Sequence, residues 1–222
     1  MSAPTRTPGR RIGVGWSSPV VHEWWFVRTP WGRAARAAER VAVMALLDEA
    51  ARGHDSVLEV GPGTGAYTIA AAPLVRRLVA VEPEREMRRY LASRLRDEGH
   101  ANVSVRDGRL PHPLAAETAF DGALAVGVLD FVPDLDGALG ALARATRPGG
   151  WVIVTTPAAT PAGRLATLTG RLKGRRVWAR RRSELRAAAM RAGLRVRRLS
   201  SVGVLPGGRT LVALAIAEAP AP

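Results

Sequence analysis

The 222-residue sequence has no cysteine, which excludes a disulfide framework, a thiolate metal site and a cysteine nucleophile. This lack fits a reducing compartment, and we expect a cytoplasmic protein. The sequence also has no run of 18 apolar residues, so no helix is predicted to span a bilayer. Histidine is scarce as well, and His54, His100 and His112 lie in predicted loops without the spacing of metal ligands. We therefore predict no metal site.

Lysine is almost absent, yet the net charge is +14. All basic residues except Lys173 are arginine, and alanine and glycine are abundant, which is typical of a GC-rich genome. The charge is also local, because residues 170–200 hold twelve basic residues and one acid, Glu184. We interpret the basic stretch 170–182, which contains Trp178, chiefly as a solvated face. Peripheral contact with an anionic membrane, or with another polyanion, is the alternative.

Short apolar strands alternate with helical segments over the first two thirds of the chain. The strands lack a clean alternation of apolar and polar residues, which indicates burial on both faces and a parallel sheet covered by helices. The predicted strands are 56–60, 77–82, 102–107, 120–128 and 151–157, and the predicted helices are 34–52, 66–74, 83–99 and 133–146.

The last third of the sequence has a different pattern. A helix is predicted with Ser183 as its N-cap and Gly193 after its end. Two strands, 195–205 and 209–217, then flank a Gly-containing connection, so at least one strand of the sheet is predicted to be antiparallel. At the other end of the chain, residues 1–19 lack the apolar stretch of a signal peptide and are predicted to be a flexible lead-in.

The stretch VLEVGPGTGAYT is the strongest indication of a ligand-binding site in the sequence. Gly61, Gly63 and Gly65 directly follow a strand, where backbone amides must approach a ligand closely and a Cβ would obstruct them. The helix that follows has its N-terminus at the same place, which favours a negatively charged ligand group. The pattern also satisfies the dinucleotide fingerprint G-x-G-x-x-A, ending at Ala66, so a dehydrogenase is one alternative.

Acids at the next two strand ends narrow the ligand class. Glu82 ends the second strand, 21 positions after Gly61, where a carboxylate can accept both hydroxyls of an adenosine ribose. Asp107 ends the third strand, and Gly108 follows it. Because parallel strands end at one edge of the sheet, the set predicts a nucleoside-type cofactor. Either acid alone could instead be a helix N-cap or a solvated loop residue.

These residues resemble, motif by motif, the class I S-adenosylmethionine-dependent methyltransferases, and in particular the small-molecule "type 11"-like group. The segments that carry the resemblance are LEVGPGTG, VAVEP, VRDG, AVGVLDFVPD, RPGGWVIVTTP and SELRAAAMRAGL. The resemblance implies an α/β fold, a Rossmann-like three-layer sandwich with a mostly parallel seven-stranded sheet and a C-terminal antiparallel hairpin strand. It implies a single domain over 20–217, with a lid and helix (20–53), a cofactor-binding core (54–157) and a substrate-side connection with the terminal hairpin (158–217), followed by a tail (218–222).

The resemblance implies S-adenosylmethionine as the cofactor. Glu59 supports this against the dehydrogenase alternative, because it would repel a pyrophosphate but favours the cationic end of S-adenosylmethionine. The residues implied to bind the cofactor are Glu59, Gly61, Gly63, Thr64, Gly65, Glu82, Asp107, Gly108, Gly127 and Val128.

The resemblance places the methyl-bearing end of the cofactor just after the fourth strand. Asp130 lies there and is the candidate catalytic residue that would orient or deprotonate a substrate, with helix capping as the alternative. Tyr67 is interpreted as substrate-facing or as a packed aromatic. Trp24 and Trp25, with Phe26, are interpreted as a lid over the site, with ordinary core packing as the alternative.

The predicted function is methyl transfer by in-line displacement to a small-molecule acceptor, including lipid-like acceptors. The first alternative is an RNA or protein methyltransferase, although nucleic acid is not expected as a partner because the chain leaves no room for an added recognition domain. The second is a non-catalytic cofactor-binding partner protein. The sequence determines neither the acceptor atom nor the oligomeric state.

Overall fold

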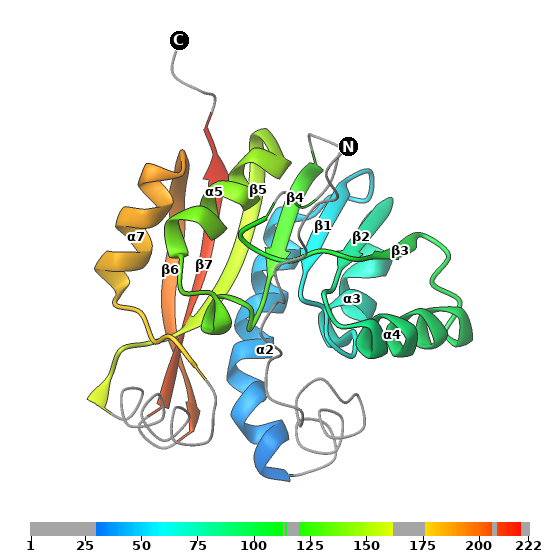
Figure 1. The fold of residues 1–222 in the computed structure, drawn as a ribbon, viewed down its shortest axis with the longest axis horizontal. Coiled ribbons are helices and arrows are strands. Elements are labelled where there is room, and N and C mark those ends of the chain that lie inside the picture. The colour runs from blue at the N-terminus through cyan, green and yellow to red at the C-terminus, as the bar shows by residue number, and fades with distance from the viewer. Residues whose placement is uncertain (1–29, 113, 115–119, 162–175, 206–207, 219–222) are drawn as a thin grey trace, which may run out of the picture.

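Seven strands form one mixed sheet in the order β3-β2-β1-β4-β5-β7-β6 (Figure 1). The computed structural model describes residues 30–112, 114, 120–161, 176–205 and 208–218. The strands are β1 (Ser56–Val60), β2 (Arg77–Val81), β3 (Val103–Arg106), β4 (Phe120–Ala125), β5 (Thr146–Pro157), β6 (Leu194–Leu205) and β7 (Gly208–Ala217). Neighbouring strands from β3 to β5 are parallel, whereas β7 is antiparallel to both β5 and β6. The predicted sheet with a reversed strand in the C-terminal hairpin is confirmed.

Helices cover both faces of the sheet and complete the predicted three layers (Figure 1). The helices are α2 (Pro30–Ala50), α3 (Ala66–Ala71), η2 (Ala72–Leu74), α4 (Arg85–Asp97), η3 (Leu129–Phe131), α5 (Leu135–Ala145) and α7 (Arg182–Arg191). Apolar residues of α2 and α4 pack on one face, and those of α5 and α7 pack on the other. Each strand therefore needs apolar residues on both sides.

Strand β1 illustrates why the sequence shows no alternation. Val57 and Leu58 are both fully buried, although they point to opposite faces of the sheet. Val57 belongs to the core under α2, and Leu58 belongs to the core under α5 and α7. Burying one fully exposed aliphatic side chain of this size contributes about 1.5–3 kcal/mol, so this double-sided pattern accounts for much of the driving force for the fold.

Several predicted bounds differ from the structure: α2 begins at Pro30 rather than at residue 34, and β4 ends at Ala125 rather than at residue 128. Ser183 is not the N-cap of the last helix, because α7 begins at Arg182 and the N-cap is Arg181. The backbone N–H of Arg181 donates to the Glu184 carboxylate at 2.8 Å, so the acid three residues later fixes the helix start. Strand β5 begins at Thr146 rather than Trp151, with a shift in its register against β4.

Helix α2 links the two halves of the sheet. It packs against β5, β6 and β7, and Glu49 near its C-terminus pairs with Arg198 of β6 at 2.8 Å. Its first turns project past the carboxyl ends of the parallel strands (Figure 1). The same helix therefore buries an apolar face under the sheet and carries residues to the edge where ligands bind in open α/β sheets.

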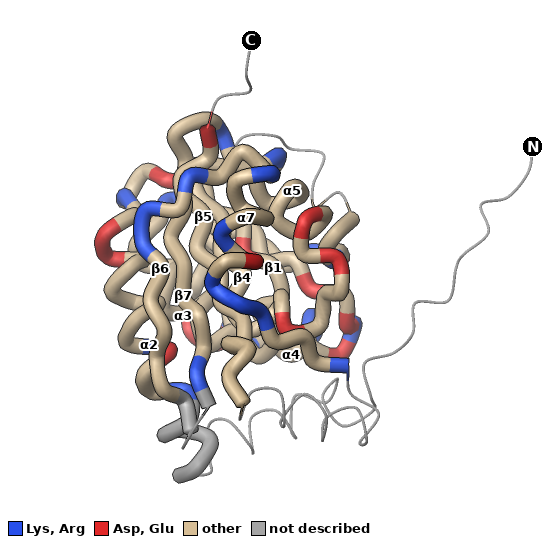
Figure 2. The backbone as a smooth tube through the Cα atoms, turned by 90° about the vertical axis from the view of Figure 1, so that its left-hand side faces the viewer, with Lys and Arg blue, Asp and Glu red and all other residues tan. Residues whose placement is uncertain are grey.

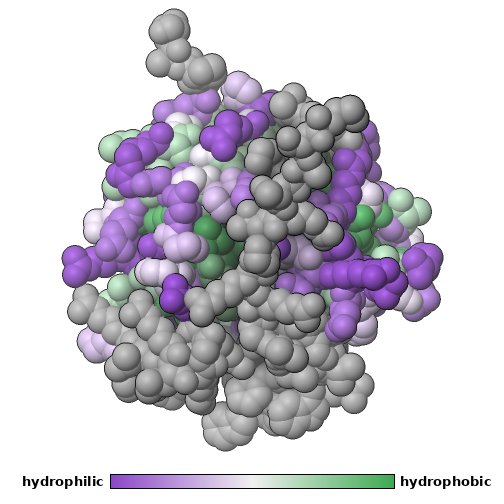
Figure 3. Space-filling model, in the orientation of Figure 1, coloured by the Kyte–Doolittle hydropathy of each residue, from purple (hydrophilic) through white to green (hydrophobic). Residues whose placement is uncertain are grey.

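Arginine gathers along β6 and on the stretch leading into α7, as the blue tube segments in Figure 2 show. Hydrophilic residues cover most of the described surface in the view of Figure 3, and hydrophobic ones show in recesses between them. None of the helices in the described ranges is long and apolar enough to cross a membrane. The predicted lead-in, Trp24, Trp25 and Phe26, residues 170–175 and the last four residues lie outside the described residues.

Candidate functional site

The Gly-rich loop lies at the carboxyl end of β1, beside the carboxyl end of β4. The strand order reverses between these two strands, which is where open α/β sheets bind ligands. Gly61, Gly63 and Gly65 all have positive φ angles, of 67°, 57° and 90°, a region that glycine enters without steric cost. A Cβ on Gly61 would overlap the side chain of Val128. The glycines therefore allow both the turn and the close approach of the β4 end.

Helix α4 and strand β2 hold this loop in place. The backbone N–H of Gly61 donates to the carbonyl of Val81 at 2.8 Å. Arg94 of α4 donates to the carbonyl of Thr64 at 3.1 Å, and Thr64 itself is buried. The predicted loop residues are thus gathered at one place by contacts from two separate elements.

Glu82 lies at the end of β2 and faces the loop. Its Oε2 accepts a hydrogen bond from the backbone N–H of Gly63 at 3.3 Å, and its Oε1 accepts one from the N–H of Glu84 at 3.0 Å. Burial raises the pKa of the carboxyl, and nearby Glu84 raises it further, although the two N–H groups act against this. Glu84 and not Glu82 is the N-cap of α4. The arrangement leaves Glu82 as a fixed, buried acceptor beside the glycines.

Glu59 is buried beneath the loop within β1. Its Oε2 has no hydrogen-bond partner among the described residues, an unusual state for a buried oxygen. Burial raises the pKa of Glu59 to about 7, and the charge of Glu82 adds to the shift. A cationic ligand group near this oxygen would lower that pKa again and supply the missing partner.

Asp107 differs from the other predicted acids. Its side chain is 74% exposed and accepts from Arg88 of α4 at 3.0 Å, so it is paired on the surface. The next residue, Gly108, lies where an added Cβ would overlap Val81 of β2. The β3 end therefore packs closely on β2, while Asp107 stays at the rim.

The carboxyl end of β4 brings Gly127, Val128 and Asp130 to the same edge. The N–H of Gly127 donates to the Thr155 hydroxyl of β5 at 2.9 Å. The capping alternative for Asp130 does not hold, because Asp134 caps α5 by accepting from the N–H of Gly137 at 2.8 Å. The Oδ1 of Asp130 is instead buried without a hydrogen-bond partner among the described residues. Burial raises the pKa of Asp130 to about 7, opposed by the charge of Arg36.

Helix α2 supplies two further residues that the sequence analysis missed. Arg36 Nη1 donates to Glu39 Oε1 at 2.7 Å, and the Tyr67 hydroxyl donates to the same oxygen at 3.3 Å. Glu39 is 4% exposed, and a Cβ on Gly127 would lie 3.4 Å from Arg36 Nη1. Burial and the charge of Glu39 raise the pKa of Tyr67, which keeps the phenol protonated. One feature of the sequence could have pointed to Glu39. It is an acid on the buried face of a helix whose apolar residues lie three and four positions apart.

The stretch 176–181, which we call the strap, lies against the loop that carries Asp130. The N–H of Trp178 donates to the carbonyl of Asp130 at 2.7 Å, and Arg180 Nη2 donates to the carbonyls of Val132 and Pro133 at 2.8 and 2.9 Å. The Arg180 guanidinium also lies 5.5 Å from the ring centroid of Trp178. At least this part of the basic segment is thus a structural contact rather than a purely solvated face.

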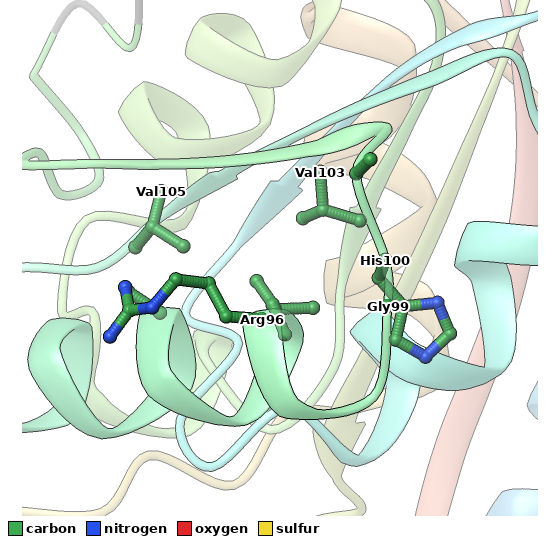
Figure 4. A pocket seen from close by; sticks show the side chains of 8 residues that line it. Arg96, Gly99, His100, Val103 and Val105 are labelled. Carbon is green, nitrogen blue, oxygen red and sulfur yellow. The ribbon is translucent and has the colours of Figure 1, made fainter.

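One cavity of the described structure lies away from these residues. A cavity of about 400 Å³ is lined by the C-terminal half of α4, by the following turn and by β3, and Figure 4 shows Arg96, His100 and Val103 around it. It lies along the outer edge strand, away from the reversal between β1 and β4. Its lining is mostly apolar and includes neither the glycines nor the acids described above, so we do not assign the cofactor to it.

The residues at the strand ends fit S-adenosylmethionine. The loop glycines expose backbone, Glu82 offers a buried carboxylate for ribose hydroxyls, and the unpartnered Oε2 of Glu59 suits a cationic ligand. Tyr67 lies at the same edge, whereas the predicted Trp24 and Trp25 cannot be placed because they lie outside the described residues. Across the described ranges, no group of three or more His, Asp or Glu side chains is arranged to hold a metal ion.

Comparison with known proteins gives three kinds of likeness. A family profile described as "Methyltransferase domain" matches residues 32–199. Ribosomal RNA small subunit methyltransferase A from Desulforapulum autotrophicum is 45% identical over 59 residues, which is 27% of this chain and 21% of the relative. The chain spans less than half the length of each curated relative it matches.

Two solved structures share the fold over most of the chain. YcgJ from Bacillus subtilis superimposes with a TM-score of 0.70 at 15% identity, covering 81% of this chain and 99% of that protein. Geranyl diphosphate C-methyltransferase from Streptomyces coelicolor, solved with Mg²⁺, geranyl diphosphate and S-adenosyl-L-homocysteine, gives a TM-score of 0.68 at 14% identity. That match covers 80% of this chain and 78% of the other.

Proposed function

The chain belongs to the methyltransferase-domain family, and from that premise we propose that it transfers a methyl group from S-adenosylmethionine to a small molecule. The observation that carries the proposal is the buried, unpartnered Oδ1 of Asp130 at the carboxyl end of β4. It lies at the same sheet edge as the Gly-rich loop, between α2 and the strap. A small acceptor that donates a single polar group would supply the partner that this oxygen lacks.

The cofactor is S-adenosylmethionine, and the chain's own residues hold it at the strand ends. The backbone of Gly61 to Gly65 would approach it, Glu82 would accept from its ribose hydroxyls, and Glu59 under the loop would act as a counter-charge. When bound, the cofactor supplies an electrophilic methyl group on a positively charged sulfur. Asp130 orients the acceptor and accepts its proton where the reacting group carries one.

Several features support a small and partly apolar acceptor. Phe131, next to Asp130 in the chain, is an aromatic residue that is 40% exposed. Trp178 of the strap provides a second aromatic group beside the same loop. Geranyl diphosphate C-methyltransferase, which aligns over most of this chain, was solved with geranyl diphosphate bound. Apolar surroundings at the reacting group would favour a displacement reaction because they exclude competing water.

An RNA acceptor is the second candidate, and two observations favour it. The net charge is +14, and the region around α7 and β6 is rich in arginine (Figure 2). A ribosomal RNA methyltransferase is also among the relatives, although the match covers 27% of this chain. Basic surfaces bind polyanions without sequence preference, so charge alone does not make RNA the acceptor.

The proposal is tested by incubating the protein with S-adenosylmethionine labelled on its methyl group and extracts of the source cells. The metabolite, RNA and protein fractions are then counted separately. We expect label in the metabolite fraction with the wild-type protein. The Asp130→Asn variant is the matched control, and it should transfer no label. Label confined to RNA, falling steeply with salt, would instead establish the second candidate. Failure to bind the cofactor at millimolar concentration would refute both.

A further inference from the structure

Helix α2 brings a second carboxylate to the edge of the sheet where Asp130 lies. Glu39 is buried, and its Oε1 accepts from both Arg36 and Tyr67. Arg36 lies over Gly127 at the end of β4, and the charges of Arg36 and Glu39 both act on the Asp130 carboxyl. Two acids and one guanidinium, from elements about 90 residues apart in sequence, are therefore neighbours.

We propose that Glu39 and Asp130 form an acceptor subsite that binds an amine or hydroxyl group of the methyl acceptor, with a protonated amine preferred, and that excludes an anionic group. This inference rests on the proposed function, and it specifies the acceptor's chemistry. Glu39 and Arg36 become specificity-determining residues, in addition to Asp130.

The hydrogen-bonding state of the cluster supports the choice of a donor group. Asp130 Oδ1 is buried and lacks a donor among the described residues, so a ligand N–H or O–H would supply it. The Arg36 guanidinium already donates to Glu39. An acceptor with a carboxylate or phosphate at this point would offer only more lone pairs to the ionised Asp130 carboxylate.

The charges of the cluster point the same way. Arg36 carries one positive charge against the two carboxylates, while Tyr67 stays neutral because its pKa is raised. Arg40 also acts on Tyr67, but it is exposed and therefore screened by solvent. An ammonium group would balance the second acid, whereas an anion would add a third negative charge within a buried cluster.

The raised pKa of Asp130, about 7, is consistent with a cluster that lacks its cation. Bringing an ammonium group to Asp130 would favour the ionised carboxylate and lower that pKa. Phe131 follows Asp130 in the chain and is 40% exposed, and Trp178 donates its backbone N–H to the Asp130 carbonyl, so an amine on an aromatic or otherwise apolar body suits the surroundings.

The test uses three probes that share one aromatic body and differ in the head group: phenethylamine, 2-phenylethanol and phenylacetate. Their binding to the full chain is measured by protein-detected NMR with S-adenosylhomocysteine present, so the cofactor's own amino and carboxylate positions are filled. No methyl transfer is needed. We expect phenethylamine to bind about tenfold more tightly than phenylacetate, with 2-phenylethanol between them.

Charge-removing variants locate the effect. Glu39→Gln and Asp130→Asn should each remove most of the preference for phenethylamine, while Glu49→Gln, which changes an exposed acid on the same helix, should keep it. If a variant does not fold, the wild-type probe series still shows whether the site prefers an amine to a carboxylate.

Four results would overturn the inference. The first two are equal or tighter binding of phenylacetate, and no binding of any probe. The third is an amine preference that is measured without S-adenosylhomocysteine but disappears when it is present. The fourth is a preference that stays unchanged in both variants. Each of them leaves the proposed function intact if labelled methyl still reaches the metabolite fraction. Loss of cofactor binding would instead refute the proposed function itself.

Discussion

At the scale of single residues, Glu82 is the clearest example of a side chain held ready for a ligand. Two backbone N–H groups fix its carboxylate, and burial prevents water from competing for it. The bond from Gly63 also ties the Gly-rich loop to the residue that follows β2. A cofactor ribose would therefore meet an acceptor whose position is already set, which reduces the ordering cost of binding.

We predict that Glu82→Ala weakens S-adenosylmethionine binding by about 1–3 kcal/mol, because charge-assisted hydrogen bonds to the ribose are lost. Isothermal titration calorimetry measures the change. Glu86→Ala, which alters an exposed acid in the first turn of α4, is the control and should bind as the wild type does. Equal affinities for the two variants would mean that Glu82 only stabilises the loop.

Glu59 gives a prediction about pH and stability. Burial raises its pKa from 4.5 to about 7 in the folded protein, so the folded state holds its proton more tightly than the unfolded state. The stabilisation by the protonated form is present below pH 4.5 and is lost as the pH rises through 7. Ionised Glu59 thus lowers the free energy of unfolding above neutral pH by at most roughly 3 kcal/mol.

Glu59→Gln should therefore be more stable than the wild type at pH 8, and the difference should shrink as the pH falls toward 5. Thermal unfolding of the ligand-free protein across this range measures it. Gln carries no charge at any pH, so a stability difference that stays constant with pH would contradict the raised pKa of Glu59.

At the scale of elements, the strap changes how the Arg-rich connection is understood. Arg180 is one of the arginines in a run that looks uniformly solvated in the sequence. Its guanidinium nevertheless reaches two carbonyls of the loop after η3, and its backbone pairs with the end of β5. The strap thereby holds the loop that carries Asp130 from the side opposite α2.

We expect Arg180→Met to lower the free energy of unfolding by about 1–3 kcal/mol, because two hydrogen bonds from a charged donor are lost while the aliphatic stem remains. Amide hydrogen exchange should quicken at Trp178 and at residues 129–132. Arg181→Met is the matched control, since that residue is exposed and its backbone N–H alone donates to Glu184. Unchanged exchange in Arg180→Met would show that the strap does not restrain the loop.

At the scale of the whole molecule, the charge is uneven. The described acids cluster with the strand ends and helices, while arginine dominates β6 and the approach to α7 (Figure 2). Several arginines of this region form ion pairs with acids of the same chain. These pairs are Arg198–Glu49, Arg195–Glu218 and Arg191–Asp136. Exposed pairs of this kind contribute little to stability, so the net charge acts chiefly on association.

We predict that the protein binds single-stranded RNA of arbitrary sequence at 50 mM salt and loses affinity steeply toward 200 mM, by an amount set by the number of phosphates contacted. Fluorescence anisotropy with a labelled homopolymer measures this. Cofactor binding by the same sample should change far less over that range, because its groups are buried. Salt-independent RNA binding would contradict a purely electrostatic contact.

Much of the fold and of the cofactor site could be predicted because their signals are local. Gly61, Gly63 and Gly65 follow a strand directly, and the turn that they make needs positive φ angles that other residues rarely adopt. Glu82 comes at the end of the next strand, so strand alternation alone brings it to the same edge. Asp107 was placed at that edge for the same reason, but its exposure and its pairing with Arg88 depend on how α4 packs.

Other features depended on contacts between distant segments. Asp130 and Asp134 are equally good capping residues in the sequence, and only the structure shows that Asp134 caps α5 while Asp130 is buried. Ser183 is a better N-cap by residue type than Arg181, yet the bond from Arg181 to Glu184 sets the helix start. Local preference was overridden there by the path of the strap into α7.

By itself, the sequence determined the alternation of strands and helices, the Gly-rich loop and the acid that follows it, because each depends on neighbouring residues or on one repeated period. Only the tertiary structure decided that Arg36 and Glu39 of α2 meet Tyr67 and Asp130, and that Arg180 turns inward to the loop after η3. These contacts join residues separated by about 30 to 90 positions, and whether two such side chains meet is fixed by how helices pack on the completed sheet.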